Sequence, residues 1–190
     1  MLLTKTLVLS EIFASIQGEG EDAGTPCVFI RLAGCNLNCP FCDTKYAHAG
    51  RAYSAENIVK AALATGLRYA VLTGGEPMIH DLAELVHRLH DEEFYVALET
   101  NGTIAVPTGL FNRVTVSPKS DTLVQTRGHE MKLLWGIVPD PEAMRIKYPD
   151  FNRYSIQPMS GESVPEIINY LLEHPKWRLS AQVHKLLGLR

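Results

Sequence analysis

Three of the four cysteines of this 190-residue chain lie close together, and this cluster limits what the chain can be more than any other feature. Cys35, Cys39 and Cys42 are too near one another to be bridged well among themselves, and Cys27 is the only other thiol. A secreted disulfide scaffold has more cysteines in a shorter chain. Clustered thiolates are instead typical of a zinc site or an iron–sulfur site.

An iron–sulfur cluster fits this set of ligands better than zinc does. Structural zinc takes four protein ligands, and the candidates for the fourth, Cys27 and His48, lie at no familiar zinc-finger spacing. Three thiolates hold a 4Fe-4S cubane and leave one iron open to bind a small molecule. We therefore predict that the three clustered cysteines ligate a 4Fe-4S cluster, with a non-enzymatic zinc module as the alternative. Cys27 is expected to be a small buried residue of a strand.

Composition and charge narrow the class of protein. With 46% hydrophobic and 21% charged residues and a net charge of −3, the chain has the composition of an ordinary globular protein. The charge excludes a broadly basic nucleic-acid surface. No apolar run approaches the ~20 residues of a membrane span, and the first five residues show no signal segment. We expect one domain over residues 1–190, located in the cytoplasm, with no direct nucleic-acid or membrane partner.

Predicted strands and helices alternate along the chain, which is typical of a parallel α/β fold. Polar or glycine-rich clusters follow several strands, as at the rim of a parallel barrel where active sites form. The chain is shorter than the ~250 residues of a complete eight-fold barrel, so we predict a partial, open parallel (β/α) barrel. The predicted strands are 7–16, 28–32, 69–72, 94–98, 113–116, 131–134 and 154–156, and the predicted helices are 54–64, 81–90 and 163–172.

Two motifs resemble those of the radical S-adenosylmethionine (SAM) superfamily. One is the cysteine motif with Phe41 before its third cysteine, and the other is the glycine-rich strand end Thr73-Gly74-Gly75-Glu76-Pro77. The resemblance implies that the open iron binds the amino and carboxylate groups of SAM, and that one electron then yields a 5′-deoxyadenosyl radical. Because glycine has no Cβ, we expect the 74–75 backbone to approach a ligand closely. Glu76 is expected to anchor its loop or the cofactor amine.

Further segments narrow this resemblance to the 7-carboxy-7-deazaguanine synthase family, over about residues 11–190. Such enzymes contract the pyrazine ring of 6-carboxy-5,6,7,8-tetrahydropterin, release ammonia and use SAM catalytically in queuosine and deazapurine biosynthesis. The resemblance implies a lyase of the same kind. Its segments are Glu11-Ile12-Phe13, Gln17-Gly18-Glu19-Gly20, 31–37, 42–44, Glu99-Thr100-Asn101-Gly102, 117–119, 157–159 and 177–185.

The resemblance also implies which residues meet the substrate. Arg31 would bind the substrate carboxylate, for which a planar two-pronged donor is the natural partner. The terminal carboxylate of Arg190 would fold back to the pterin. His184 is expected to be structural, although it lies near the site. The substrate residues implied by the family are Ile16, Gln17, Gly18, Arg31, Thr73 and Arg190.

A second set of residues is implied for SAM and for a metal ion. Thr44 would coordinate Mg²⁺ through its hydroxyl, because magnesium prefers hard oxygen ligands. The residues implied to meet SAM are Phe41, Cys42, Asp43, Gly75, Ser117, Pro118, Lys119, Gln157, Pro158, Met159 and Ser160.

The family suggests a homodimer and an electron donor such as flavodoxin or ferredoxin, but the sequence identifies neither the dimer interface nor the donor. A glycyl-radical enzyme activase, which has the same cysteine spacing, is the alternative enzyme. It would act on a large protein and leave Gln17, Arg31 and Thr44 without a role. His80, His87 and His90 lack the i, i+4 spacing of a helical metal pair, so we place them on one helix facing solvent.

Overall fold

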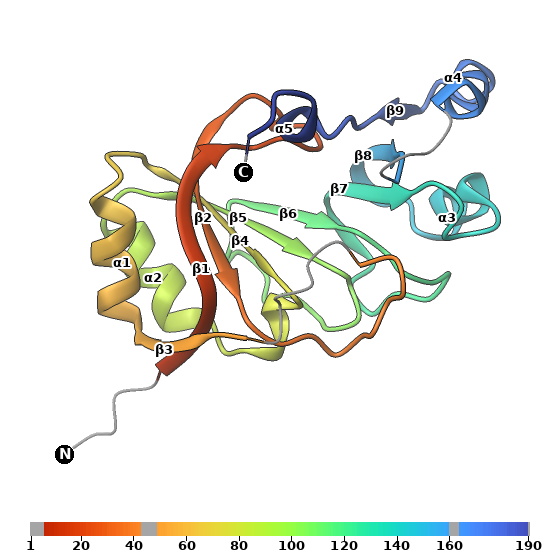
Figure 1. Ribbon diagram of the computed structural model, residues 1–190. Helices are drawn as coiled ribbons and strands as arrows, with labels where there is room; N and C mark the ends of the chain where they lie inside the picture. The colour runs from red at the N-terminus through yellow and green to blue at the C-terminus, as the bar shows by residue number, and fades with distance from the viewer. Residues whose placement is uncertain (1–5, 43–48, 160–163, 190) are drawn as a thin grey trace. The chain divides into compact units, whose positions relative to one another are not determined.

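We describe the protein from a computed structural model, which describes residues 6–42, 49–159 and 164–189 (Figure 1). Four residues with predicted ligands, Asp43, Thr44, Ser160 and Arg190, lie outside this described part, as does His48. The chain forms two compact units, which we describe one at a time. The first comprises Met1–Ser15, Pro26–Thr100 and Val106–Arg113, and the second comprises Ile16–Thr25, Asn101–Ala105 and Val114–Arg190.

The first unit is built on parallel strands with an antiparallel edge. Its central strands β2, β4 and β5 pair in parallel, and the predicted long first strand pairs antiparallel with β3. The central strands are buried on both faces, which explains their nearly continuous apolar sequences. In sheet order the strands are β3 (Arg51–Ser54), β1 (Thr6–Ile16), β2 (Pro26–Leu32), β4 (Tyr69–Gly74) and β5 (Tyr95–Thr100).

Two helices, α1 (Ala55–Leu63) and α2 (Ala83–Asp91), lie side by side in this unit (Figure 1). The side chain of Ser54 caps α1 by accepting a hydrogen bond from the Asn57 N–H at 3.2 Å. Each helix buries one apolar stripe, in α2 the residues Leu85, Val86 and Leu89. Both helices were predicted from this spacing, and the structure confirms them.

Among its described residues, the second unit contains four consecutive parallel strands and three helices. The strands pair in chain order, β6 with β7, β7 with β8, and β8 with β9. Its core includes Met131, Ile156, Ile167 and Trp177. The elements are β6 (Arg113–Val116), β7 (Arg127–Leu134), α3 (Pro141–Lys147), β8 (Asp150–Gln157), α4 (Val164–Glu173), β9 (Trp177–Leu179) and α5 (Val183–Leu186).

The predicted α/β class is confirmed, and neither unit closes its strands into a barrel. Sequence reasoning missed five elements of the described residues: β3, the 3₁₀ helix η1 (Pro77–Ile79), α3, β9 and α5. Four of them have only three or four residues, too few to show a period. In contrast, α3 carries a readable signal, because Asp140 caps it and Pro141 is its first residue. In the described part of the chain, no helix is long and apolar enough to cross a membrane.

Candidate functional site

The cysteine loop begins directly after β2. Cys35 and Cys39 are partly buried, Cys42 is exposed, and none of them forms a disulfide. The Leu37 N–H donates to Cys35 Sγ at 3.4 Å, and the Cys42 N–H donates to the Cys39 carbonyl at 3.1 Å. The loop therefore presents three thiols outside any disulfide, and Cys35 already receives a backbone donor of the kind that stabilises a thiolate ligand.

This set of donors fits an iron–sulfur cluster. A cubane takes one thiolate at each of three irons, so the three sulfurs need not converge on one point. Within residues 6–42, 49–159 and 164–189, no three His, Cys, Asp or Glu side chains are gathered to hold a single ion. Cys27, a candidate fourth ligand for zinc, has no exposed surface and packs in the core with Val71 and Ala97. The prediction that Cys27 is a buried strand residue is confirmed.

The glycine-rich end of β4 lies against the start of the cysteine loop. In the β2–β4 register Leu32 is opposite Gly74, and the Glu76 N–H donates to the Gly34 carbonyl at 2.9 Å. Gly74 has φ +138°, and a Cβ there would lie 2.1 Å from the Leu32 carbonyl oxygen. A Cβ on Gly75 would lie 1.9 Å from the Gly34 oxygen. These two glycines are therefore required by close approach to the neighbouring backbone, in addition to any role toward a ligand.

Glu76 has no exposed surface and anchors this loop, as predicted. Its Oε1 accepts hydrogen bonds from Thr100 Oγ1 at 2.7 Å and from the Met78 N–H at 3.0 Å. His80 was placed with the helix residues facing solvent, and this was wrong. It lies before α2, is half-buried, and its Nε2 is 2.7 Å from the Ala33 carbonyl oxygen, next to the cysteine loop.

Arg31 lies near the carboxyl end of β2, opposite Thr73 of β4. Its Nε donates to Glu11 Oε1 at 2.8 Å, and both side chains are largely buried. Sequence reasoning missed this pairing, because it depends on which strands lie side by side. The ion pair fixes the orientation of the guanidinium, the group predicted to bind a carboxylate.

In the second unit, the segment after β1 folds back on itself. The Gln17 N–H donates to the Thr25 carbonyl and the Gly24 N–H donates to the Gln17 carbonyl, each at 2.8 Å. The Gly18 carbonyl accepts from the Val183 N–H at 2.8 Å. A Cβ on Gly18 would lie 2.0 Å from His184 Nδ1, so only glycine leaves room for this ring. The structure thus places His184 beside a residue predicted to bind substrate.

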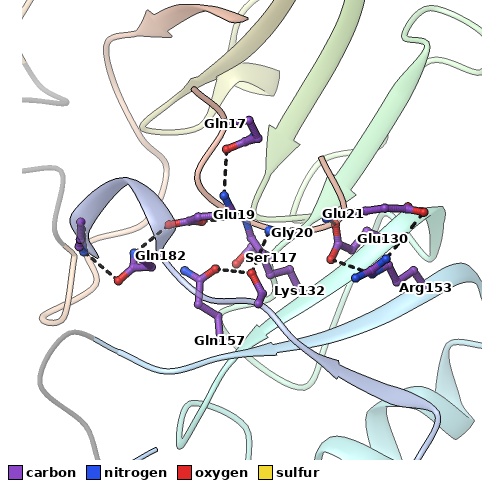
Figure 2. Close-up of polar contacts among 12 residues, drawn as sticks. Gln17, Glu19, Gly20, Glu21, Ser117, Glu130, Lys132, Arg153, Gln157 and Gln182 are labelled. Carbon is purple, nitrogen blue, oxygen red and sulfur yellow. Dashed lines mark hydrogen bonds and ion pairs between the residues drawn. The ribbon is translucent and has the colours of Figure 1, made fainter. Parts of the chain in front are cut away.

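Glu19 is the acceptor of a buried polar cluster (Figure 2). Its Oε2 is 2.8 Å from Lys132 Nζ, and its Oε1 accepts from Gln182 Nε2 at 2.7 Å. Burial alone would raise the pKa of Glu19. The Lys132 charge and the hydrogen bonds from Gln182, Lys132 and Gln157 outweigh burial and lower that pKa to about 2. The carboxylate is therefore ionised at neutral pH.

The residues predicted to meet SAM in this unit lie at the carboxyl ends of β6 and β8. Lys119 Nζ donates to Ser117 Oγ at 2.7 Å, just after β6. Gln157, at the end of β8, is buried, and its Oε1 accepts from Ser180 Oγ at 2.9 Å. Since parallel strands of one sheet end on the same edge, these groups share that edge. Pro118 is buried there as well.

The structure thus brings the predicted residues together in two sets. In the first unit the cysteine loop with Phe41, the end of β4 and Arg31 lie at the carboxyl ends of β2 and β4. In the second unit the set comprises the 17–18 segment, which follows Ile16, and the ends of β6 and β8, with Pro158 and Met159 directly after β8. The ligand of each residue stays a prediction. Sequence reasoning missed Lys132 and Gln182, although a lysine between apolar residues in a strand signals a buried anionic partner.

The chain is similar to known proteins in sequence and in fold. A family model described as the Radical SAM superfamily matches residues 29–120. The 7-carboxy-7-deazaguanine synthase of Bradyrhizobium diazoefficiens is 42% identical over 214 residues, covering 96% of this chain and 98% of that protein. The synthase of the same name from Bacteroides thetaiotaomicron is 39% identical, with 96% and 98% coverage. The crystal structure of QueE from Escherichia coli matches with a TM-score of 0.81 at 32% identity, covering 94% of this chain and 95% of that one.

Proposed function

This chain belongs to the 7-carboxy-7-deazaguanine synthase family of the Radical SAM superfamily, and from that membership we propose its reaction. The protein is a lyase that converts 6-carboxy-5,6,7,8-tetrahydropterin into 7-carboxy-7-deazaguanine with release of ammonia, a step of queuosine and deazapurine biosynthesis. The observation that carries the proposal is the similarity to named synthases over nearly the whole length of both proteins. The three thiols of the cysteine loop, beside the glycine-rich end of β4, are of the type that such an enzyme needs as ligands.

Cys35, Cys39 and Cys42 are the proposed ligands of the 4Fe-4S cluster, and the backbone at Gly75 is the proposed neighbour of SAM. When bound, the cluster and SAM supply the radical that removes a hydrogen atom from the substrate, and SAM is used catalytically. The protein's own contribution near these thiols is geometric. Glu76 fixes the loop that carries Gly75, because its carboxyl group accepts from Thr100 at the end of β5 and from the Met78 N–H.

Arg31 is the proposed partner of the substrate carboxylate. Its Nε is already bonded to Glu11, so the guanidinium is held in one orientation before substrate binds, which lowers the entropic cost of binding. Thr73, opposite Arg31 in the parallel register, is the proposed second contact from this unit. In the second unit, Ile16, Gln17 and Gly18 are proposed to line the pterin edge.

Ser117, Pro118 and Lys119 are proposed to hold the ribose or methionine end of SAM. The residues Gln157, Pro158 and Met159, at and after the end of β8, are proposed for the adenine side. Phe41 and Cys42 contribute from the cysteine loop. Four further assignments fall outside the described residues: Asp43 and Ser160 to SAM, Thr44 to Mg²⁺, and the Arg190 carboxylate to the substrate.

Several properties of the protein are proposed from the family membership. Residues 1–190 form one functional domain, since the superfamily model includes residues of both compact units. The enzyme is a homodimer in the cytoplasm, takes electrons from a flavodoxin or ferredoxin, and requires Mg²⁺. Sedimentation analysis tests the dimer. Omission of Mg²⁺ or exchange of the reductant in the assay tests the other two requirements.

The central experiment is anaerobic reconstitution of the full chain with iron and sulfide, followed by incubation with a reductant, SAM and the carboxytetrahydropterin. We expect about four irons per chain and formation of the deazaguanine acid. Cys35→Ser, Cys39→Ser and Cys42→Ser should each lose product formation, whereas Cys27→Ser should retain it because that thiol lies in the core. Slow 5′-deoxyadenosine release without deazaguanine would favour the activase, and stoichiometric zinc in place of iron would favour the zinc module.

A further inference from the structure

The segment 17–21, which we call the substrate turn, is held in the second unit by side chains from two places (Figure 2). The Gly20 N–H donates to Ser180 Oγ at 2.9 Å, and the Glu21 N–H donates to Glu130 Oε2 at 3.0 Å. The first acceptor belongs to the segment after β9, and the second belongs to β7. Backbone groups of a turn need such partners, because a turn has no strand ladder of its own.

Strand β7 contacts the turn through alternate residues. Glu130 and Lys132 are two positions apart, so their side chains leave the strand on the same face. Glu130 accepts from the backbone of the turn, while Lys132 binds the side chain of Glu19 at 2.8 Å. A Cβ on Gly20 would lie 2.5 Å from Glu130 Oε2. The turn therefore lies in direct contact with this face of β7.

Glu19 joins this strand to the C-terminal segment. The Lys132 side chain is 5% exposed, and the Glu19 carboxylate compensates its ammonium charge at 2.8 Å. The other oxygen of Glu19 accepts from Gln182, whose neighbour Val183 donates to the Gly18 carbonyl. Removal of the carboxylate would leave a buried cation and release one of the links between the turn and residues 180–184.

We propose that Glu19 is a positioning residue for substrate binding: by holding Lys132 and Gln182 together, it fixes the substrate turn in the shape that receives the pterin edge. The inference rests on the proposed function, because that function assigns Gln17 and Gly18 to the pterin. Glu19 itself need not touch the substrate. Gln157, assigned to SAM, also hydrogen-bonds Glu19, but it keeps its second bond, from Ser180 Oγ, when Glu19 is changed. The larger effect should therefore fall on the pterin.

The test uses the full-length protein with its reconstituted cluster and the variant Glu19→Gln. We expect the KM for the pterin to rise about tenfold, while the KM for SAM changes by less than about twofold. Gln182→Ala removes the uncharged partner of Glu19 and should raise the pterin KM by a smaller factor. This variant replaces Glu19→Gln as the test if Glu19→Gln does not fold. Glu84→Gln is the matched control, because it removes an ion-paired carboxylate at an exposed site on α2 and should leave both constants unchanged.

Hydrogen exchange gives a second measurement that needs no turnover. Peptides covering residues 16–22 and 178–186 should exchange faster in Glu19→Gln than in the parent, and equally in Glu84→Gln and the parent. An unchanged pterin KM, an equal rise of both KM values, or unchanged exchange in these peptides would overturn the positioning role. If the parent forms no deazaguanine, the proposed function fails, and the exchange data still decide whether Glu19 holds the turn.

Discussion

Glu76 is a carboxylate with no exposed surface, and it depends on donors from its own loop and from β5. Thr100→Val removes the hydroxyl donor and keeps the shape of the side chain. We expect the free energy of unfolding to fall by about 2 kcal/mol, since a fully buried acceptor loses a hydrogen bond. Urea denaturation of both proteins measures this difference in the free energy of unfolding. Thr122→Val makes the same change at an exposed site and should alter stability little, so equal losses in both variants would contradict the anchoring role of Glu76.

The ionisation of Glu19 should make the free energy of unfolding depend on pH in the acid range. Its pKa in the fold is about 2, below the ordinary value of 4.5, so ionisation favours the folded state. This contribution is complete above pH 4.5 and disappears as the pH falls toward 2, with a size of at most roughly 3 kcal/mol. The stability difference between the parent and Glu19→Gln should therefore shrink on acidification, as urea denaturation at a series of pH values would show.

Lys132→Met provides the control for that titration. The Lys132 charge is the largest of the contributions that lower the pKa of Glu19, so its removal should reduce the stability gained between pH 2 and pH 5. An acid dependence that is the same in Lys132→Met and the parent would mean that another group causes it.

At single positions, the sequence indicates what a residue does better than it indicates which residues lie next to it in space. The roles of Glu76 as a loop anchor and of Cys27 as a buried residue follow from local sequence, and the structure confirms both. The partners of Arg31 and Lys132 are 20 and 113 positions away in the chain, and pairs so distant are set by strand order and loop paths. No local sequence pattern indicates strand order or loop paths.

Among the elements, β4 ends at Gly74, and both this residue and Gly75 directly after it lie too close to the neighbouring backbone for a Cβ. Gly75→Ala would place a methyl group 1.9 Å from the Gly34 carbonyl oxygen, so either the end of β4 or the cysteine loop must move. We expect a loss of about 2 kcal/mol in stability and a lower iron content after reconstitution, measured as iron per chain. Full iron loading in Gly75→Ala would show that the loop does not depend on this contact.

Gly109→Ala separates this steric effect from backbone strain. Gly109 has φ +77°, and a Cβ added there would meet no atom within 4 Å, so alanine at this position introduces left-handed strain alone. It should cost about 1 kcal/mol and leave the iron content unchanged. The difference in iron between the two variants isolates the contact between β4 and the cysteine loop.

The elements that sequence reasoning found are those with a period or a cap. Helices α1 and α2 have enough turns to show an apolar stripe, and the central strands are apolar runs closed by glycine or polar residues. Strand β9 has three residues, and it exists because Trp177 packs into the core and its Nε1 donates to Glu142 Oε2 at 3.0 Å. Tertiary packing of this kind leaves no local pattern to read.

For the molecule as a whole, neither compact unit alone corresponds to the family. The superfamily model covers residues 29–120, which include parts of both units, and the named synthases match about 96% of the chain. We therefore expect ligand binding to stabilise the entire chain as one cooperative system.

Thermal unfolding with and without SAM tests this expectation. At a hundredfold excess over Kd, SAM should stabilise the cluster-loaded protein by about 2.7 kcal/mol, which raises the Tm of a chain of this size by roughly 5–10 °C. Cys35→Ser should abolish the shift, because SAM would lose the iron that binds its amino and carboxylate groups. Cys27→Ser should begin from a lower Tm, since it puts a hydroxyl into the core, and still show the full shift. A single transition moving as a whole would support one cooperative system, whereas two transitions of which only one responds to SAM would show that the units unfold separately.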